Sequence, residues 1–258
     1  MPCCSELFYR QYKNNSETEN SVPLVLLHGS GGSHLAWPVE IRRMRGCNVI
    51  ALDLPGHGQS GGSACQSLEA LVSALHTFFR ECAIRKMALI GYSLGAALAA
   101  AYARAYPTQV QGMALLAGGS RFSFPAALLD ALRNFNHQTQ FIEIFNRLVF
   151  NPAYPQAERR KILEPLAKID PGVLWMDLQI CLNYSLPAGW EKVNCPVILI
   201  NGADDAVVST CAAREMAYSL PHASLTVLPG CGHMLIYEKT ALITPILHDF
   251  FNSQMIGK

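Results

Sequence analysis

The chain has 258 residues, of which half are hydrophobic and only 15% are charged, so it has ample material for a buried core. Its 20 Lys and Arg residues against 19 Asp and Glu residues give a formal net charge of +1. It contains no basic run interleaved with aromatic residues, so a nucleic acid is not expected as a partner. This length fits one large α/β domain, or one domain with a modest insertion.

The cysteines and the beginning of the chain bear on its location. The nine cysteines are an odd number and form no CxxC pair, unlike those of a disulfide framework or a zinc site. Residues 1–22 are polar and lack the apolar stretch of a signal peptide, and no apolar run is long enough to cross a membrane. We therefore expect a cytoplasmic protein with free thiols and no membrane span.

Short apolar runs alternate with helical patterns along most of the chain. The segment 5–13 predicts an early antiparallel edge strand, and near-continuous runs of Val, Ile and Leu predict buried strands at 22–29, 47–56, 86–93, 110–119, 195–205 and 223–233. Amphipathic patterns predict helices between them at 66–82, 94–106, 209–219 and 239–253. This order predicts an α/β fold with a doubly wound, mostly parallel sheet.

The alternation stops between residues 121 and 190, where no run looks like a strand. Helical patterns occur there at 125–134, 137–149, 155–168 and 171–183, separated by segments with proline and glycine. Such a stretch is too long for a loop, so we predict a helical cap at 121–190, inserted into a core of residues 1–120 and 191–258. Apolar faces of the cap are expected to meet the core and a substrate, namely those with Phe141, Ile142, Phe145, Leu148, Trp175 and Leu178. A second apolar set suggests an acyl group or ring as the bound moiety: Phe122, Phe124, Leu128, Leu132 and Phe135.

The stretch ALIGYSLGAALAAA at 88–101 places a serine between two glycines, where an apolar run meets a helical pattern. In an abrupt turn from strand to helix, the turning residue has a strained backbone, and its side chain is exposed above the sheet edge. Side chains two positions before and after it would collide, which explains glycine at 91 and 95. We therefore predict that Ser93 is a nucleophile.

A serine hydroxyl needs a base that removes its proton, and the base needs a third group that holds it. Among eight histidines, His233 lies in the glycine-rich loop GCGHM after the last apolar strand, which makes it the predicted base. The loop NGADDAVVS at 201–209 follows the preceding strand and offers Asp204 and Asp205. Adjacent loop residues point in different directions, so only one of the two can accept the imidazole N–H.

Acyl transfer also needs hydrogen-bond donors for the oxyanion of the tetrahedral intermediate. The backbone amide of Leu94 begins the helix after the predicted nucleophile, and the loop HGSGGS at 28–33 offers the amide of Ser30. This loop has neither the lysine of a P-loop nor the GxGxxG spacing, so nucleotide binding is not expected. His28 is expected to brace the loop.

The chain resembles the α/β-hydrolase superfamily over almost its whole length, apart from the cap. The matching strings are LLHGSGGSHLAW, VIALDLPGHGQSGG, ALIGYSLGAALAAAYARAYPTQVQGMALL, PVILINGADDAVV and LPGCGHMLIYEK. The resemblance implies that Ser93 is the nucleophile, His233 the general base and Asp205, at the fourth position of Gly-x-x-Asp, the acid. It also implies that His57 in DLPGHGQS is a scaffold residue.

The first functional expectation is a serine hydrolase that cleaves carboxylic esters of small to medium size through an acyl-enzyme, without a metal or organic cofactor. The alternative is a C–C bond hydrolase or a thioesterase with the same triad, because the fold does not choose between these bonds. Such enzymes often read a substrate carboxylate with a cap arginine or asparagine, and the candidates are Arg121, Arg133, Asn134 and Arg147. A ligand sensor is the third hypothesis. The expected partner is a small-molecule ester or related acyl compound, and no oligomeric state is predicted.

Overall fold

The structure is a computed structural model that describes residues 3–4, 6–13, 22–133, 138–186 and 189–255. The predicted cap residues Asn134 and Phe135 lie outside these ranges. None of the helices in the described ranges is long and apolar enough to span a membrane.

Within these ranges, eight strands form one sheet in the order β1-β2-β4-β3-β5-β6-β7-β8. The strands are β1 (Cys3–Cys4), β2 (Leu7–Tyr12), β3 (Leu24–Leu27), β4 (Val49–Leu52), β5 (Met87–Tyr92), β6 (Val110–Leu116), β7 (Val197–Gly202) and β8 (Ala223–Leu228). Strands β3 to β8 pair in parallel, whereas β2 runs antiparallel to β4. The α/β fold predicted from the buried runs is therefore confirmed.

The segment predicted as an edge strand is second from the edge, because the two residues of β1 pair outside it. The chain turns between these strands at Glu6, a non-glycine residue with a positive φ of 64°. A strand of two residues is too short to produce a recognisable alternation, so β1 could not be predicted from the sequence.

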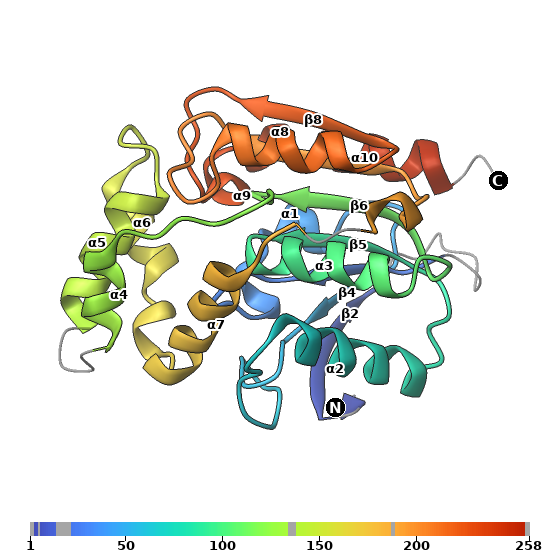
Figure 1. Cartoon of the computed structure of the whole chain (residues 1–258), viewed down its shortest axis with the longest axis horizontal. Coiled ribbons are helices and arrows are strands. Elements are labelled where there is room, and N and C mark those ends of the chain that lie inside the picture. The colour runs from blue at the N-terminus through green and yellow to red at the C-terminus, as the bar shows by residue number, and fades with distance from the viewer. Residues whose placement is uncertain (1–2, 5, 14–21, 134–137, 187–188, 256–258) are drawn as a thin grey trace.

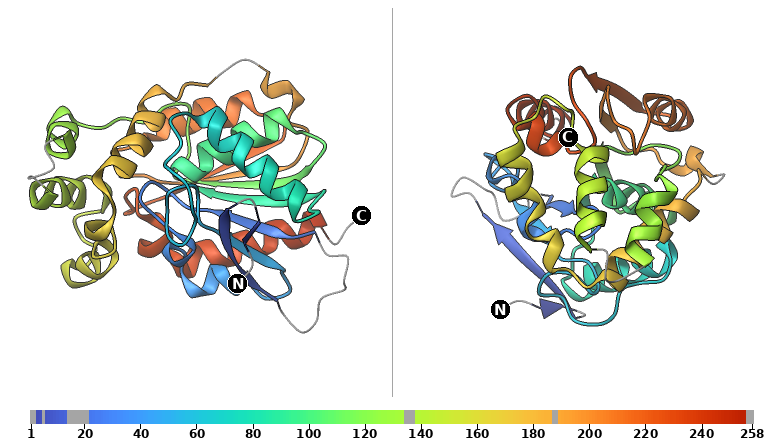
Figure 2. Two further views of the ribbon diagram at one scale, coloured as in Figure 1. Left: turned by 90° about the horizontal axis from the view of Figure 1, so that it is seen from below. Right: turned by 90° about the vertical axis from the view of Figure 1, so that its left-hand side faces the viewer.

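Helices cover both faces of the sheet, which appears nearly edge-on in the left view of Figure 2. One face carries α2 (Leu68–Glu81), α3 (Leu94–Ala105) and α8 (Thr210–Ser219), and the other carries α1 (Val39–Arg42) and α10 (Thr240–Met255). Burial on both faces explains why the parallel strands are almost continuously apolar. Four short helical elements escaped prediction because they have too few residues for a periodic pattern: η1 (His34–Ala36), α1, η4 (Trp190–Lys192) and α9 (Leu235–Glu238).

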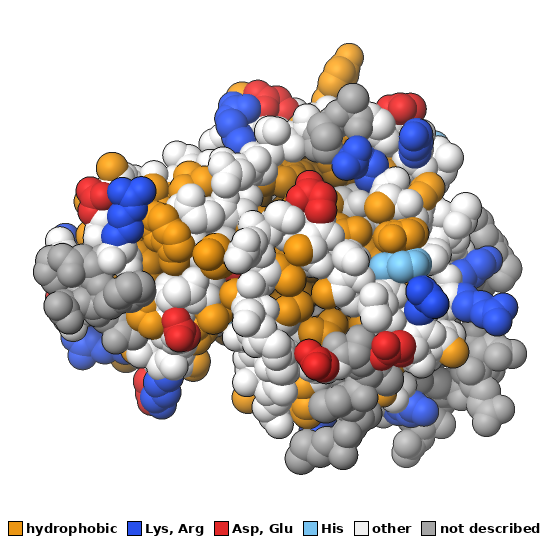
Figure 3. Space-filling model, turned by 60° about the horizontal axis from the view of Figure 1, so that its bottom comes forward, with side chains coloured by type: hydrophobic (Ala, Val, Ile, Leu, Met, Phe, Trp, Pro, Cys, Tyr) orange, Lys and Arg blue, Asp and Glu red, His pale blue; other side chains and the backbone are white. Residues whose placement is uncertain are grey.

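The helices between β6 and β7 gather beyond one end of the sheet, on the left of Figure 1. They are α4 (Ala126–Arg133), α5 (Gln138–Val149), α6 (Gln156–Leu163) and α7 (Pro171–Asn183), with the short turn η3 (Leu166–Lys168). The turn η4 (Trp190–Lys192) lies apart from them, because Gly189 before it packs beside Arg104 near the end of α3. We call α4 to α7 the cap helices. Helix α7 contacts α3 of the core and α4 of the cap group, so it joins the two. On the face shown in Figure 3, hydrophobic side chains gather over the middle of the molecule, and many charged ones lie nearer its outline.

Candidate active site

Ser93 lies at a sharp turn between β5, which ends at Tyr92, and α3, which begins at Leu94. Its backbone has a φ of 55° and a ψ of −116°, a conformation that costs a non-glycine residue free energy. A Cβ atom at Gly91 would collide with the carbonyl oxygen of Gly95, and one at Gly95 would collide with that of Leu27. The turn therefore has the steric requirements that the sequence predicted, with glycine on both sides of a strained serine.

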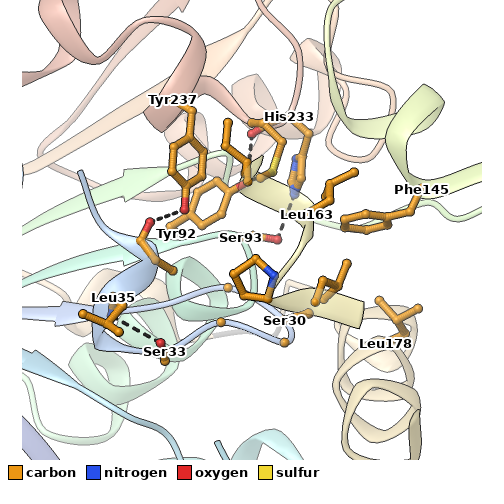
Figure 4. A pocket seen from close by; sticks show the side chains of 18 of the residues that line it. Ser30, Ser33, Leu35, Tyr92, Ser93, Phe145, Leu163, Leu178, His233 and Tyr237 are labelled. Carbon is orange, nitrogen blue, oxygen red and sulfur yellow. Dashed lines mark hydrogen bonds between the residues drawn. The ribbon is translucent and has the colours of Figure 1, made fainter. Parts of the chain in front are cut away.

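The structure brings Ser93, His233 and Asp205 together, although they come from three different strand ends. Nε2 of His233 lies 2.9 Å from Oγ of Ser93, and its Nδ1 lies 2.8 Å from Oδ2 of Asp205 (Figure 4 shows the first contact). All three residues are buried. With Nδ1–H donated to the carboxylate, Nε2 is free to accept the serine proton.

The two adjacent aspartates have different partners. Oδ1 of Asp205 accepts the backbone N–H groups of Val207 and Val208, each at 2.8 Å, which fixes the carboxylate while Oδ2 faces His233. Oδ2 of Asp204 instead accepts from Nδ2 of Asn151 at 2.8 Å and from the amide of Cys231 at 3.2 Å. Asp204 thus ties the segment after α5 to the histidine loop and does not contact the imidazole.

The two amides predicted for the oxyanion come from the helix after Ser93 and from the loop after β3. Leu94 is the first residue of α3, and Ser30 follows β3 in the loop that lines the same cavity. In the part of the chain that the structure describes, neither amide donates to another backbone carbonyl. Both N–H groups are therefore available to a ligand, at a place where the helix dipole favours negative charge.

His28 braces the loop that carries Ser30. Its Nδ1 donates to the carbonyl of Gly29 at 2.8 Å, and its Nε2 accepts the amide of Leu54 at 3.0 Å. Burial is the main reason that the pKa of His28 is lowered to about 3, and the charge of the nearby His57 contributes to the same shift. His28 is therefore neutral and serves as a fixed hydrogen-bond bridge, as the sequence predicted.

The buried Asp177 of α7 is the main residue that the sequence analysis missed. One of its oxygens accepts from the amide of Gly31 at 2.8 Å and from Nε2 of His57 at 2.9 Å. His57 also donates from Nδ1 to the carbonyl of Pro55 at 3.0 Å. One cap carboxylate thus holds both the Ser30 loop and the DLPGHGQS turn. Its signal in the sequence was a single carboxylate within an otherwise apolar helix.

The protonation of His57 follows from these contacts. Burial lowers the pKa of His57, but the hydrogen bond and the negative charge of Asp177 outweigh burial, and the net pKa is raised. Both ring nitrogens act as donors, which is the pattern of an imidazolium. His57 is thus half of a buried ion pair and does not contact Ser93, in agreement with its predicted scaffold role.

A cavity of about 390 Å³ opens over Ser93 and His233, between the core and the cap helices. In Figure 4, Phe145, Leu163 and Leu178 lie on one side of Ser93, and Leu35 and Tyr237 lie on the other. Of the apolar cap residues predicted to face a substrate, Phe124, Phe145 and Leu178 line the cavity. Phe122, Leu128 and Leu132 are instead buried in packing and are not among the lining residues, so that part of the prediction was wrong. A sequence does not distinguish an apolar side chain that lines a pocket from one that fills a core.

The arginines proposed as carboxylate readers do not line this cavity. Arg121 pairs with Glu215, and Arg133 lies over the ring of Trp175 with its Cζ 5.1 Å from the ring centroid. Arg147 is also absent from the cavity wall. The cap group contributes Lys161 to the wall instead, and its amino group lies 2.9 Å from Glu158.

The histidine loop is held from the core side by two tyrosines. The hydroxyl of Tyr92 donates to the carbonyl of His233 at 3.2 Å and lies 2.9 Å from the sulfur of Met234. Tyr237, from α9, donates to the carbonyl of Ala36. Tyr92 thus holds the loop that presents His233, and Tyr237 connects α9, which follows this loop, to the turn η1.

The doubly wound sheet, the strained serine turn and the cavity at the carboxyl ends of the strands define the class as an alpha/beta hydrolase. Residues 24–243 match the alpha/beta hydrolase family, and the chain belongs to this family. It is a hydrolase on the strength of that family and of its relatives.

Two curated relatives illustrate the range of reactions. The chain is 27% identical to a pimeloyl-[acyl-carrier protein] methyl ester esterase of Nitrosomonas europaea, over 84% of this chain and 90% of that protein. It is also 27% identical to a 2-hydroxy-6-oxononadienedioate/2-hydroxy-6-oxononatrienedioate hydrolase of Paraburkholderia phymatum, over 88% of this chain and 86% of that protein.

Among solved structures, the enol-lactonase from Burkholderia xenovorans LB400 superimposes with a TM-score of 0.86. The match covers 95% of this chain and 96% of that one, at 18% sequence identity. At this identity the likeness establishes the fold alone.

Proposed function

We propose that this protein is a serine hydrolase that cleaves carboxylic esters of small to medium size through an acyl-enzyme intermediate. The observation that carries the proposal is the continuous hydrogen-bonded row from Ser93 through His233 to Asp205, with distances of 2.9 and 2.8 Å. A serine held in this way has the base and the orienting carboxylate that its activation needs.

In the proposed reaction, Oγ of Ser93 attacks the ester carbonyl while Nε2 of His233 takes the serine proton. The carbonyl π electrons move onto oxygen, where the amides of Ser30 and Leu94 stabilise the negative charge. The intermediate collapses with cleavage of the C–O bond, and the imidazolium protonates the departing alcohol. Water deprotonated by His233 then attacks the acyl-enzyme, and the acid and the free Ser93 are released.

Two features support an ester of modest size. The cavity of about 390 Å³ is at the small end of ligand pockets. Apart from Lys161, its wall is largely apolar on the cap side, where Phe145, Leu163 and Leu178 can hold an acyl chain or a ring. No organic cofactor or metal is required by this sequence of steps.

The alternative function is that of a C–C bond hydrolase or a thioesterase. The similarity to the hydrolase of Paraburkholderia phymatum supports this alternative. The observation that favours ester cleavage is the position of Arg121 and Arg133, which engage Glu215 and Trp175 away from the cavity. Neither arginine is therefore placed to bind a substrate carboxylate in the cavity, the role expected for such a residue in a C–C hydrolase.

The test is release of nitrophenol from p-nitrophenyl esters of increasing acyl length, with the wild type beside Ser93→Ala. We expect turnover by the wild type and a loss of about 10⁶-fold in kcat in the variant. If the folded wild type releases no nitrophenol from any ester of the series, ester hydrolysis is contradicted, and C–C or thioester substrates, or a sensor, are favoured. Activity retained by Ser93→Ala contradicts the assignment of the nucleophile.

A further inference from the structure

A second recess of about 310 Å³ lies beside the active-site cavity, and the two share Leu35 as a wall. The recess is formed by β2, by the turn η1 and by α1. Its remaining lining residues are Phe8, Arg10, Tyr12, His34, Val39, Arg42, Arg43 and Gln59. It is therefore basic, whereas the cap side of the active-site cavity is apolar.

The positive charge of this recess is not balanced by acidic groups in its wall. Arg10, Arg42 and Arg43 line it, and none of them forms an ion pair within the described residues. No Asp or Glu of the described chain lines it. Asp53, which contacts the lining residues His34 and Gln59, is buried and accepts from Nδ1 of His34 at 2.8 Å and from the amide of Gln59 at 2.8 Å. An anion entering the recess would thus meet guanidinium groups first.

One of the arginines is held in place without an acid. Nη1 of Arg42 donates to the hydroxyl of Tyr12 at 3.0 Å, and its Cζ lies 5.7 Å from the centroid of that ring. Arg10 on β2 and Arg43 after α1 are exposed and line the recess from two different elements, so their guanidinium groups are accessible to a ligand. Arginine forks match the oxygens of a phosphate and bind it with two parallel hydrogen bonds.

The recess is coupled to the reaction site by more than proximity. Residues of η1 form the partition: Leu35, which is 63% exposed, faces both spaces, and Ala36 accepts from Tyr237 of the cavity wall. Burial raises the pKa of Tyr237, and the positive charge of Arg42 acts against that shift. A substrate that passes over Leu35 can therefore occupy both spaces.

We propose that this recess is a subsite for a phosphate group carried by the alcohol half of the substrate, while the acyl half lies against Phe145, Leu163 and Leu178. The inference rests on the proposed ester hydrolysis and narrows its substrate class to carboxylic esters of phosphorylated alcohols. The phosphate stays attached to the alcohol throughout, because only the acyl C–O bond breaks.

The test compares hexanoyl esters of glycerol and of glycerol phosphate, both kept monomeric in solution, with release of hexanoic acid as the readout. For the wild type we expect kcat/KM to be higher for the phosphorylated ester by about tenfold, which corresponds to one charge-assisted hydrogen bond. In the double variant Arg10→Gln/Arg43→Gln the ratio of the two kcat/KM values should approach one. Arg45→Gln, which removes an exposed neighbouring arginine outside the recess, should keep the wild-type ratio.

The outcomes separate the inference from the proposed function. A wild-type ratio near one, or an unchanged ratio in the double variant, overturns the phosphate subsite while cleavage of p-nitrophenyl esters still supports ester hydrolysis. An effect of the double variant seen only on vesicles of anionic phospholipid assigns the arginines to a membrane surface and also overturns the subsite. Failure to cleave any ester overturns the proposed function itself.

Discussion

The serine turn and the cap helices differ in how far local sequence determines their roles. At the turn, Ser93 and its flanking glycines lie within five consecutive residues, and their backbone geometry leaves little freedom for other side chains. In the cap group, Phe145, Leu163 and Leu178 come from different helices and face one cavity only because those helices pack together. A candidate nucleophile can therefore be predicted from the local sequence of a strained turn, whereas the residues that line a substrate pocket depend on tertiary packing.

After the loss expected for Ser93→Ala, the largest effect concerns the carboxylate that faces His233. Asp205→Asn should lower kcat by about 10⁴-fold with the fold intact, because an amide facing Nδ1 favours the wrong imidazole tautomer. Asp204→Asn is the matched control, since Asp204 contacts Asn151 and the amide of Cys231 and not the imidazole. Kinetics on a p-nitrophenyl ester measure both variants. Equal losses in the two variants would show that the choice of Asp205 is wrong.

The next prediction concerns the hydrogen bonds by which Asp177 of the cap helices holds the Ser30 loop and His57. Asp177→Leu leaves the imidazolium of His57 buried without a partner, so we expect the free energy of unfolding to fall by about 3 kcal/mol. The amide of Gly31 also loses its acceptor, and kcat should fall along with stability. Urea denaturation measures the first quantity and ester kinetics the second. Asp177→Asn, which keeps an acceptor for Gly31, should recover part of kcat, and no recovery would argue against a positioning role.

A smaller effect is expected on the acyl-chain specificity when a residue of the cavity wall is shortened. Phe145→Ala removes a ring from the cavity wall, so the best acyl chain in the p-nitrophenyl series should become longer. Leu148→Ala, on the same helix but outside the cavity wall, should leave the optimum unchanged. If Phe145→Ala changes the rate equally for all chain lengths, the acyl group lies elsewhere.

The smallest effect is the pH dependence of the His57–Asp177 pair. The pKa of His57 is raised in the folded protein, so its stabilising contribution is fully present below the unfolded pKa of about 6.5 and is lost as pH rises through the folded pKa. The difference in the free energy of unfolding between wild type and His57→Gln should therefore shrink from acidic to alkaline pH. Urea titrations across that range measure it, and a difference that grows with pH has the wrong sign for this account.

The sequence predicted most of the architecture because parallel strands and their helices leave strong hydrophobic patterns. It also predicted the residues that meet at Ser93, since each follows directly after a strand. It missed Asp177, whose partners Gly31 and His57 are far from it along the chain, and it missed η1, which is too short for a periodic signal. It also misplaced Phe122 and Leu128, because burial in a core and exposure to a ligand select the same side chains.

The most direct test of the central claim is covalent capture of the nucleophile. The protein is treated with an alkyl fluorophosphonate, which transfers its phosphonyl group to an activated serine hydroxyl and releases fluoride, and intact mass and peptide mass spectra are recorded. The account predicts one adduct per chain, carried by Ser93, and its loss in His233→Ala as well as in Ser93→Ala. An unmodified wild type, or an adduct on a different residue, would contradict the account.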